Sequence, residues 1–200
     1  MDVGYGASRS PEQSLRKAFE LTQKSLTLNS TCALPYYTLS LCHLFARHHQ
    51  EAIDASEKAV NFDPNDSMAH SMFAIVLAYS GKSEEAKGEI EKAFRLNPKP
   101  QAVFFSCQGI VYLQAGMYEE AISANQNGLS IEPNHIKIHY RLAACYSLIG
   151  RDDEARAEIT ALLKLSPKLS AGYLSKVLPY KNKADLDRII SALRKAGLPE

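Results

Sequence analysis

The sequence has no apolar run long enough to cross a bilayer. Its longest, Met72–Tyr79, falls far short of the roughly 20 residues that a transmembrane helix needs. The amino terminus contains Asp2, Gly4 and Gly6 and lacks the apolar core of a signal peptide. We therefore expect neither membrane insertion nor a secretory leader.

The chain also lacks an excess of charge of either sign. It has 23 lysines and arginines against 22 acidic residues, and its formal net charge is +1. Proteins that bind nucleic acids concentrate basic residues to neutralise phosphates. The balanced composition predicts that nucleic acid is not a partner.

Motifs for catalysis are missing as well. There is no GxSxG motif, no P-loop and no other glycine-rich phosphate loop, so we expect no enzyme activity and no cofactor. The four cysteines show no CxxC spacing, and three of them fall in expected helices, where a free thiol packs as a small apolar group. This pattern predicts a reducing compartment, the cytoplasm. The cysteines are Cys32, Cys42, Cys107 and Cys145.

What the sequence does contain is an internal repeat. Five short tags recur at steps of 34, 34, 35 and 34 residues. The tags are Leu28–Ser30, Phe62–Pro64, Leu96–Pro98, Ile131–Pro133 and Leu165–Pro167. Self-similarity at such a period indicates an array of stacked helical units.

Small residues line up when the tags are aligned. One column holds only alanine, and a second, in the four complete units, holds serine, alanine or glycine. Two antiparallel helices can approach closely only where no bulky side chain intervenes, so both columns predict contacts within a helix-turn-helix unit. The alanines are Ala18, Ala52, Ala86, Ala121 and Ala155, and the second column is Ser40, Ala74, Gly109 and Ala143.

Glycines mark the turn between the two helices of three units, where a left-handed residue ends the first helix. They are Gly81, Gly116 and Gly150. The first unit has Arg47 in this place. We therefore expect its turn to be less regular than the others.

The segments Gly109–Tyr112 and Gly116–Ala121, followed by Pro133, resemble the fingerprint of tetratricopeptide repeats, whose period is also 34 residues. The resemblance implies an all-α fold. It would be a right-handed α-solenoid of helix-turn-helix repeats with a C-terminal capping helix pair.

On this basis residues 1–200 form a single domain. It would comprise a disordered or extended lead (1–9), an orphan second helix of a partial repeat (10–30), four repeats (33–64, 67–98, 102–133 and 136–167) and capping helices (168–200). The orphan helix lacks the first helix of its unit, so we expect that the chain is a fragment or that its amino end docks on something else. The last helices have a polar, basic side, which favours a solubility cap over a surface for an acidic partner.

The ending, Leu178–Arg188 and Leu193–Glu200, has a more specific resemblance. It is similar to the carboxy-terminal end of bacterial multidomain proteins in which tetratricopeptide repeats follow an adenylate/guanylate cyclase domain or a winged-helix domain. This resemblance implies a regulatory or scaffold role for the segment, with the output domain outside it.

In the family, the first helix of each repeat lines the concave surface. The resemblance implies that the groove binds a peptide or helix, with apolar contacts through three units and polar ones in the fourth. The alternative is that the upstream chain, a second copy or the supercoil itself covers these residues. The predicted peptide-binding residues are Tyr37, Leu41, Leu44, Met68, Ser71, Ile75, Ser106, Ile110, Leu113, Lys137, Tyr140, Arg141 and Ala144.

Two of these residues occupy positions at which chaperone-binding relatives hold a terminal carboxylate, namely Lys137 and Arg141. The asparagines that complete such a clamp are replaced by Ile75 and Cys107, which argues against a full clamp but leaves room for an acidic side chain. His135 and His139 are four residues apart, but no third metal ligand accompanies them, so we expect structural roles and no metal site.

Three functions remain open. The first is a non-catalytic module that binds a protein or peptide partner in the groove. The second is self-assembly into a homo-oligomer, and the third is a small-molecule sensor.

Overall fold

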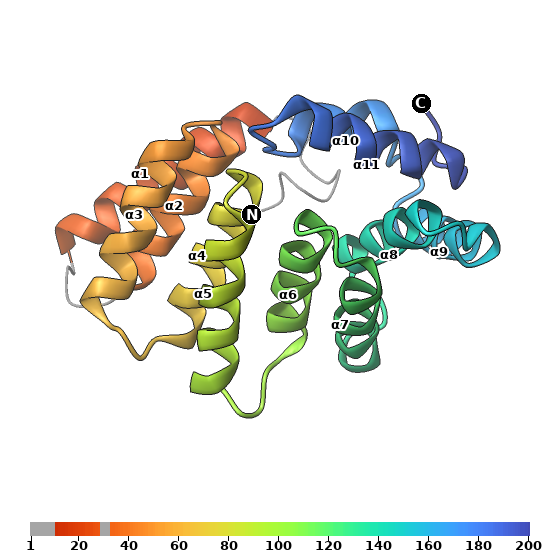
Figure 1. Ribbon diagram of the computed structural model, residues 1–200. Helices are drawn as coiled ribbons and strands as arrows, with labels where there is room; N and C mark the ends of the chain where they lie inside the picture. The colour runs from red at the N-terminus through yellow and green to blue at the C-terminus, as the bar shows by residue number, and fades with distance from the viewer. Residues whose placement is uncertain (1–10, 29–32) are drawn as a thin grey trace.

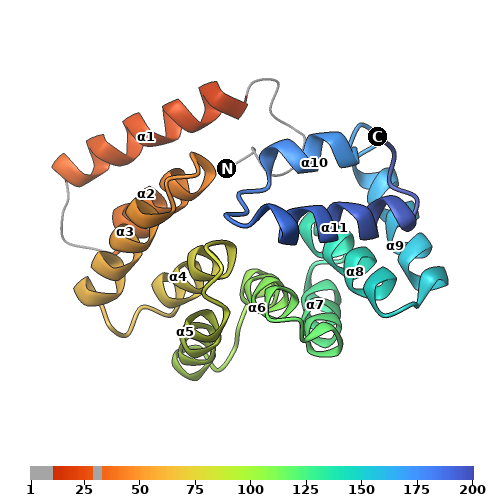
Figure 2. The ribbon, with the colours of Figure 1, turned by 45° about the horizontal axis from the view of Figure 1, so that its top comes forward.

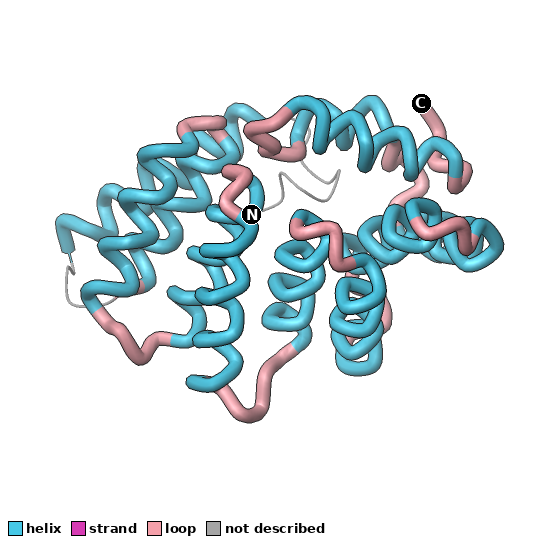
Figure 3. The backbone as a smooth tube through the Cα atoms, in the orientation of Figure 1, coloured by secondary structure: helices cyan, strands magenta, loops and turns pink. Residues whose placement is uncertain are grey.

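The structure is a computed structural model that describes residues 11–28 and 33–200, so the expected lead over residues 1–9 lies outside the described residues. These ranges contain eleven α-helices and no strand (Figures 1 and 3). The helices are α1 (Pro11–Leu28), α2 (Leu34–Phe45), α3 (His49–Phe62), α4 (Ser67–Tyr79), α5 (Ser83–Leu96), α6 (Ala102–Gln114), α7 (Tyr118–Ile131), α8 (Ile136–Leu148), α9 (Asp152–Leu165), α10 (Ala171–Val177) and α11 (Lys183–Lys195). None of these helices is both long and apolar enough to span a membrane.

Helices α2 to α9 form four antiparallel pairs that stack into an arc. The first helix of each pair contacts the first helix of the next, and these helices line the inner side of the arc, whereas α3, α5, α7 and α9 lie outside (Figure 2). Helix α1 packs against α2. The expected all-α helical repeat solenoid is confirmed.

The alanine column lies where the paired helices touch. Ala52, Ala86, Ala121 and Ala155 have no exposed surface at all, as close helix packing requires. Ala18 is only half-buried. Among the described residues α1 packs chiefly on α2, so its alanine lacks the second wall that encloses the other four.

The turns between paired helices have the same left-handed geometry in all four repeats. The φ angles of Gly81, Gly116 and Gly150 are 82°, 75° and 82°, and that of Arg47 is 64°. The turn at Arg47 is closed by a 2.9 Å hydrogen bond from His48 N to the His43 carbonyl, as at the corresponding places of the other repeats. The expectation of a less regular turn was therefore wrong.

The side chain of Arg47 offers a reason for its presence. Its guanidinium donates hydrogen bonds to the carbonyls of Lys176, at 3.0 Å, and Tyr180, at 3.3 Å. Arg47 thus ties the first repeat to the far end of the chain, at the cost of a conformation that only glycine adopts without strain.

This cost can be measured with two variants. Arg47→Ala and Arg47→Gly lose the same hydrogen bonds, but only glycine relieves the left-handed backbone. We expect Arg47→Gly to be more stable than Arg47→Ala by about 1 kcal/mol in urea unfolding. Equal stabilities would show that the turn relaxes out of the left-handed region when the side chain is shortened.

The C-terminal helices do more than cap the last repeat. Helix α11 packs along α8, and the segment Leu178–Lys181, between α10 and α11, reaches the end of α4 (Figure 2). Lys181 N donates to the Tyr79 carbonyl at 3.0 Å, and the rings of Tyr79 and Tyr180 meet edge-on with centroids 5.0 Å apart. We call Leu178–Lys181 the crossing segment, because it joins the fourth repeat to the second across the inside of the arc.

Basic residues of α11 are engaged within the chain. Arg194 pairs with Glu200 at 2.6 Å, Lys195 with Asp152 at 2.9 Å and Arg188 with Asp185 at 3.2 Å. These three residues are therefore partly engaged by acidic groups of the same chain, although ion pairs at exposed positions contribute little stability. The capping role of these helices stays a prediction.

Candidate functional site

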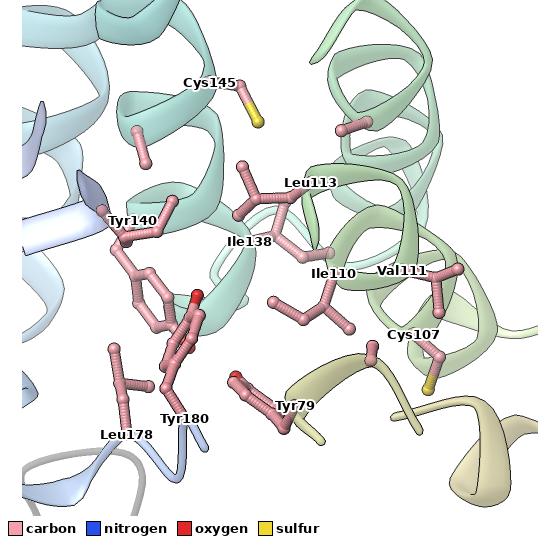
Figure 4. Packing of buried hydrophobic residues seen from close by; sticks show 14 of the residues in the cluster. Tyr79, Cys107, Ile110, Val111, Leu113, Ile138, Tyr140, Cys145, Leu178 and Tyr180 are labelled. Carbon is pink, nitrogen blue, oxygen red and sulfur yellow. The ribbon is translucent and has the colours of Figure 1, made fainter. Parts of the chain in front are cut away.

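The inner side of the arc contains a hollow of about 200 Å³. Its lining residues come from α2, α4, α6 and α8, from His135 before α8 and from Leu178 of the crossing segment. Figure 4 shows Leu178 beside Tyr140 and Tyr180. Its lining has an apolar group and a second group that carries most of the polar side chains. The apolar group is Leu41, Phe45, Met72, Ile75, Val103 and Leu178, and the second group is Tyr79, Ser106, Cys107, His135, Lys137, Tyr140 and Arg141.

The structure brings six of the predicted peptide-binding residues to this hollow. They are Leu41, Ile75, Ser106, Lys137, Tyr140 and Arg141. Tyr37 and Met68, in the first turns of α2 and α4, are half-buried and pack against the core. That all of these residues contact a peptide stays a prediction.

Five predicted residues lie in the core and do not line the hollow. They are Leu44, Ser71, Ile110, Leu113 and Ala144, each at most 1% exposed. The first helices of neighbouring repeats contact one another, so the side chains between them are enclosed. The expected groove is therefore narrower than the resemblance implies.

Sequence reasoning missed several lining residues that share a position in the repeat. Met72 stands four residues after Met68, as Arg141 stands four after Lys137, and Cys107 has the equivalent place in α6. Phe45 and Tyr79 stand four residues after Leu41 and Ile75. Residues four apart lie on the same helix face, so this signal was present in the sequence. Leu178 carried no such signal, because it enters from outside the repeats.

Arg141 is the most unusual residue of the hollow. Only 3% of it is exposed, and its Nη1 donates to the carbonyl and hydroxyl oxygens of Ser106 at 2.6 and 2.8 Å. Its Nε has no hydrogen-bond partner, and no carboxylate of the described residues pairs with it. Burial disfavours the charged form, but Tyr140 and Tyr79 outweigh it, so the pKa of Arg141 is raised and the guanidinium stays protonated.

Two further bases lie beside Arg141. The pKa of Lys137 is lowered to about 8, first by burial and then by the charge of Arg141. The same causes, with Lys137 added, lower the pKa of His135 to about 4, and His135 Nδ1 is buried without a partner. No acidic side chain of the described residues lines the hollow.

His139 faces away from the hollow and has a structural role that recurs in the second repeat. Its Nδ1 lies 2.7 Å from Glu158 Oε2, and its Nε2 lies 2.9 Å from the Pro133 carbonyl. In the second repeat, His70 Nδ1 likewise contacts Glu89 Oε2, and His70 Nε2 contacts the Pro64 carbonyl. Both nitrogens of His139 are occupied, so it has none to share with His135 on a metal, and no cluster of three metal-ligating side chains exists among the described residues.

The His139 pair should make stability depend on pH. Glu158 raises the pKa of His139, burial opposes this, and the Pro133 carbonyl adds to the rise. Protonated His139 contributes its full stabilisation at pH values below the unfolded pKa of about 6.5. This contribution to the free energy of unfolding is lost as the pH rises through the higher pKa of the folded state. We expect His139→Gln to lose about 1–2 kcal/mol at pH 5.5 and clearly less at pH 8.5 in urea unfolding.

Glu158→Gln is the matched control, because it breaks the same ion pair by removing the carboxylate of Glu158 while His139 stays in place. It should show a loss of stability that shrinks with pH in the same way. Losses that stay constant over this range in both variants would contradict a protonated His139.

Comparisons with known proteins agree with the fold. An all-α solenoid of helix pairs defines a class of helical repeat proteins. Two family models, both described as tetratricopeptide repeat, match residues 34–66 and 112–175. These two segments are therefore similar to tetratricopeptide repeats.

Several known proteins are similar to the chain. The small glutamine-rich tetratricopeptide repeat-containing protein 2 of Mycosarcoma maydis is 26% identical over 112 residues, which cover 56% of this chain and 32% of that protein. The crystal structure of TTC0263, a thermophilic protein of the same repeat class from Thermus thermophilus, has a TM-score of 0.69 and 23% identity, covering 91% of this chain and 92% of that one. YrrB, described as having an unusual peptide-binding site, has a TM-score of 0.54 and 21% identity, covering 88% and 90%.

The chain spans a third or less of the length of the curated relatives that it matches. At this level of identity the solved structures show the fold alone. The activity and partners of those proteins are not carried over to this chain.

Proposed function

We propose that the chain is a non-catalytic protein-interaction module that receives a peptide segment or helix of a partner in its concave groove. The observation that carries the proposal is the hollow of about 200 Å³, whose apolar lining residues come from successive repeats. Tetratricopeptide-repeat proteins commonly bind other proteins, and YrrB is described as having a peptide-binding site, which supports this function.

The half-buried apolar residues of the first helices suit such a partner. Leu41 and Ile75 line the hollow, Met68 lies in the first turn of α4, and each retains apolar surface that a ligand can cover. Burial of apolar surface contributes about 25 cal/mol per Å², so two or three anchoring side chains are enough for measurable binding. The partner backbone would lie along the inner side of the arc while one side chain enters the hollow.

The proposed context is the regulatory or scaffold part of a larger bacterial signalling protein in the cytoplasm. The resemblance of the ending Leu178–Arg188 to such proteins supports the first part. The buried, unpaired thiols of Cys42, Cys107 and Cys145 fit a reducing compartment.

Selection from a displayed peptide library tests the function. Peptides enriched on the wild-type chain should lose at least tenfold in affinity on Ile75→Asp, which places a charge in the apolar part of the lining. Ile131→Asp is the matched control: Ile131 is 53% exposed and does not line the hollow, so binding should be unchanged. Thermal unfolding of both variants confirms that they fold. A selection that enriches no peptide, or peptides that bind both variants equally, would contradict the proposal.

A second candidate is self-association through the amino-terminal helices. Leu21 of α1 is 55% exposed and Leu34 of α2 is 53% exposed, so both keep apolar surface that a second copy can cover. If these residues form an interface, light scattering should show a dimer that Leu21→Lys converts to a monomer. A wild-type chain that stays monomeric at high concentration rules this out.

A further inference from the structure

The crossing segment lies against the repeats in the way that an extended peptide would. Leu178, Pro179 and Tyr180 are three consecutive buried residues outside any helix, and Leu178 has extended backbone angles, with φ −68° and ψ 124°. Lys181 and Asn182, which follow, are exposed. A buried stretch without helical hydrogen bonds must satisfy its backbone groups through its surroundings, so its contacts show what the repeats can recognise.

The repeats hold this stretch by its main chain. The Arg47 guanidinium donates hydrogen bonds to the carbonyls of Lys176, at 3.0 Å, and Tyr180, at 3.3 Å. In the other direction, the Lys181 N–H donates to the Tyr79 carbonyl at 3.0 Å. Hydrogen bonds to the main chain do not depend on the side chains of the bound stretch, so an extended segment with a different sequence can form equivalent ones.

Two side chains of the segment add specificity, and they are two residues apart. Leu178 lines the hollow, and the Tyr180 ring meets the Tyr79 ring edge-on with centroids 5.0 Å apart (Figure 4). Gln114 Nε2 donates to the Tyr180 hydroxyl at 2.7 Å. Alternate residues of an extended chain point to the same side, so one apolar side chain and one tyrosine can be recognised together.

The groups that hold the segment occupy related places in three successive repeats. Tyr79 and Gln114 each stand two residues before the glycine of the turn, and Arg47 replaces that glycine in the first repeat. The segment therefore contacts the carboxyl ends of α2, α4 and α6, beside the hollow (Figure 2). A repeat array offers an extended ligand this kind of surface, because similar positions recur along it.

The segment can leave these contacts while the last helix stays in place. Helix α10, which precedes the segment, packs chiefly on α11, whereas α11 packs along α8. The attachment to the first three repeats thus depends largely on Arg47, Tyr79 and Gln114. Local opening of such a connection can require less free energy than unfolding of the whole chain.

We propose that the place of the crossing segment is the binding site for the partner, and that the partner displaces the segment. The partner contributes an extended stretch in which an apolar residue is followed two residues later by a tyrosine, as in Leu178–Tyr180. This inference rests on the proposed function and names the kind of segment that the groove receives. In the free chain the crossing segment is then an autoinhibitory contact, because it occupies the site to which the partner binds.

The chain's own segment competes with any free peptide, since it is tethered next to the site. Tethering over a short distance corresponds to an effective concentration of about 1 mM. A free peptide that makes the same contacts should therefore bind the wild type weakly. It should bind more tightly to a chain whose tethered segment has lost part of its contacts.

The probe is a fluorescently labelled, end-capped peptide with the sequence of residues 176–183, and fluorescence anisotropy measures its binding to the whole chain. We expect the Tyr180→Ala chain to bind it at least tenfold more tightly than the wild type. Ile159→Ala, in the core of α9, is the matched control: it also removes a buried side chain but leaves the crossing contacts intact, so it should bind no more tightly than the wild type. A peptide that carries Tyr180→Phe should bind the Tyr180→Ala chain about fivefold more weakly, because it lacks the hydroxyl that accepts from Gln114.

Hydrogen exchange on the wild type tests displacement without any substitution, and it decides the matter if Tyr180→Ala does not fold. At about 1 mM peptide, a large share of the chains should carry the peptide in place of their own segment. The Lys181 N–H should then exchange at least tenfold faster. The amide of Leu193, within α11, should keep its protection, because this helix remains packed on α8.

Several results would overturn the inference. They are equal binding of the peptide to the wild type and to Tyr180→Ala, absence of binding to both, and a Lys181 N–H that stays protected at millimolar peptide. If peptides selected from the library bind the wild type while this N–H stays protected, displacement is refuted and the proposed function stands. If the library yields no peptide on the wild type or on Tyr180→Ala, the groove receives no foreign segment and the proposed function itself fails.

Discussion

Tyr180→Ala should lower the free energy of unfolding by about 3–5 kcal/mol, the usual cost of deleting a large buried aromatic side chain. Tyr180 is 5% exposed and packs edge-on against Tyr79, and its hydroxyl accepts a 2.7 Å hydrogen bond from Gln114 Nε2 (Figure 4). It therefore joins the crossing segment to α4 and α6. Urea unfolding monitored by circular dichroism measures the loss.

Hydrogen exchange shows whether the loss is local to the crossing. The Lys181 N–H, which bonds to the Tyr79 carbonyl, should be protected in the wild type and exchange much faster in Tyr180→Ala. Tyr180→Phe is the matched control, because it deletes only the hydroxyl and should cost about 0.5–1.5 kcal/mol. If Tyr180→Ala lowers the free energy of unfolding by less than about 1 kcal/mol, the contacts of the crossing segment with α4 and α6 contribute little to the stability of the fold.

Gly109→Ala should destabilise the chain by about 1–3 kcal/mol, although alanine is the better helix former. Gly109 lies in α6 against Asn125 of α7, and a methyl group at Gly109 would collide with the Asn125 side chain. Asn125 has no exposed surface, and its amide donates to the Ala121 carbonyl at 2.8 Å, so it has little freedom to move.

A double-mutant cycle isolates this contact. Asn125→Ala removes the obstacle, so Gly109→Ala in that background should cost little or even stabilise, giving a coupling of at least about 1 kcal/mol. Equal effects of Gly109→Ala in both backgrounds would contradict the close approach of α6 and α7. The measurement also tests the small-residue column, since Ala74 and Ala143 occupy the same place in other repeats.

The repeat architecture could be predicted because its signals are local and recur. Ala86 and its equivalents mark the contact within each helix pair, and Gly81 and its equivalents mark each turn. The same logic failed at Arg47, where a non-glycine residue adopts the left-handed conformation. Its backbone strain is offset by hydrogen bonds from the Arg47 guanidinium to the carbonyls of Lys176 and Tyr180. These two residues lie far away in the sequence, so no local pattern predicts the contact.

The candidate site could be predicted only in part for the same reason. The family's groove positions include Leu41, Ile75 and Lys137, which line the hollow, whereas Arg141 came from the comparison with chaperone-binding relatives. That these residues contact a peptide stays a prediction. The burial of Arg141 depends on packing among α4, α6 and α8. The presence of Leu178 in the lining depends on a tertiary contact outside the repeats.

Methionine methyl NMR provides the most direct test of the binding surface. Met72 lines the hollow and Met68 lies in the first turn of α4, whereas Met117 lies in the turn before α7 and does not line the hollow. When a peptide selected on the wild-type chain is added to chain labelled at the methionine methyls, we expect shifts at Met72 and Met68 and an unchanged Met117 signal. A shift at Met117 with Met72 unchanged would place the partner outside the concave groove and contradict binding on the inner side of the arc.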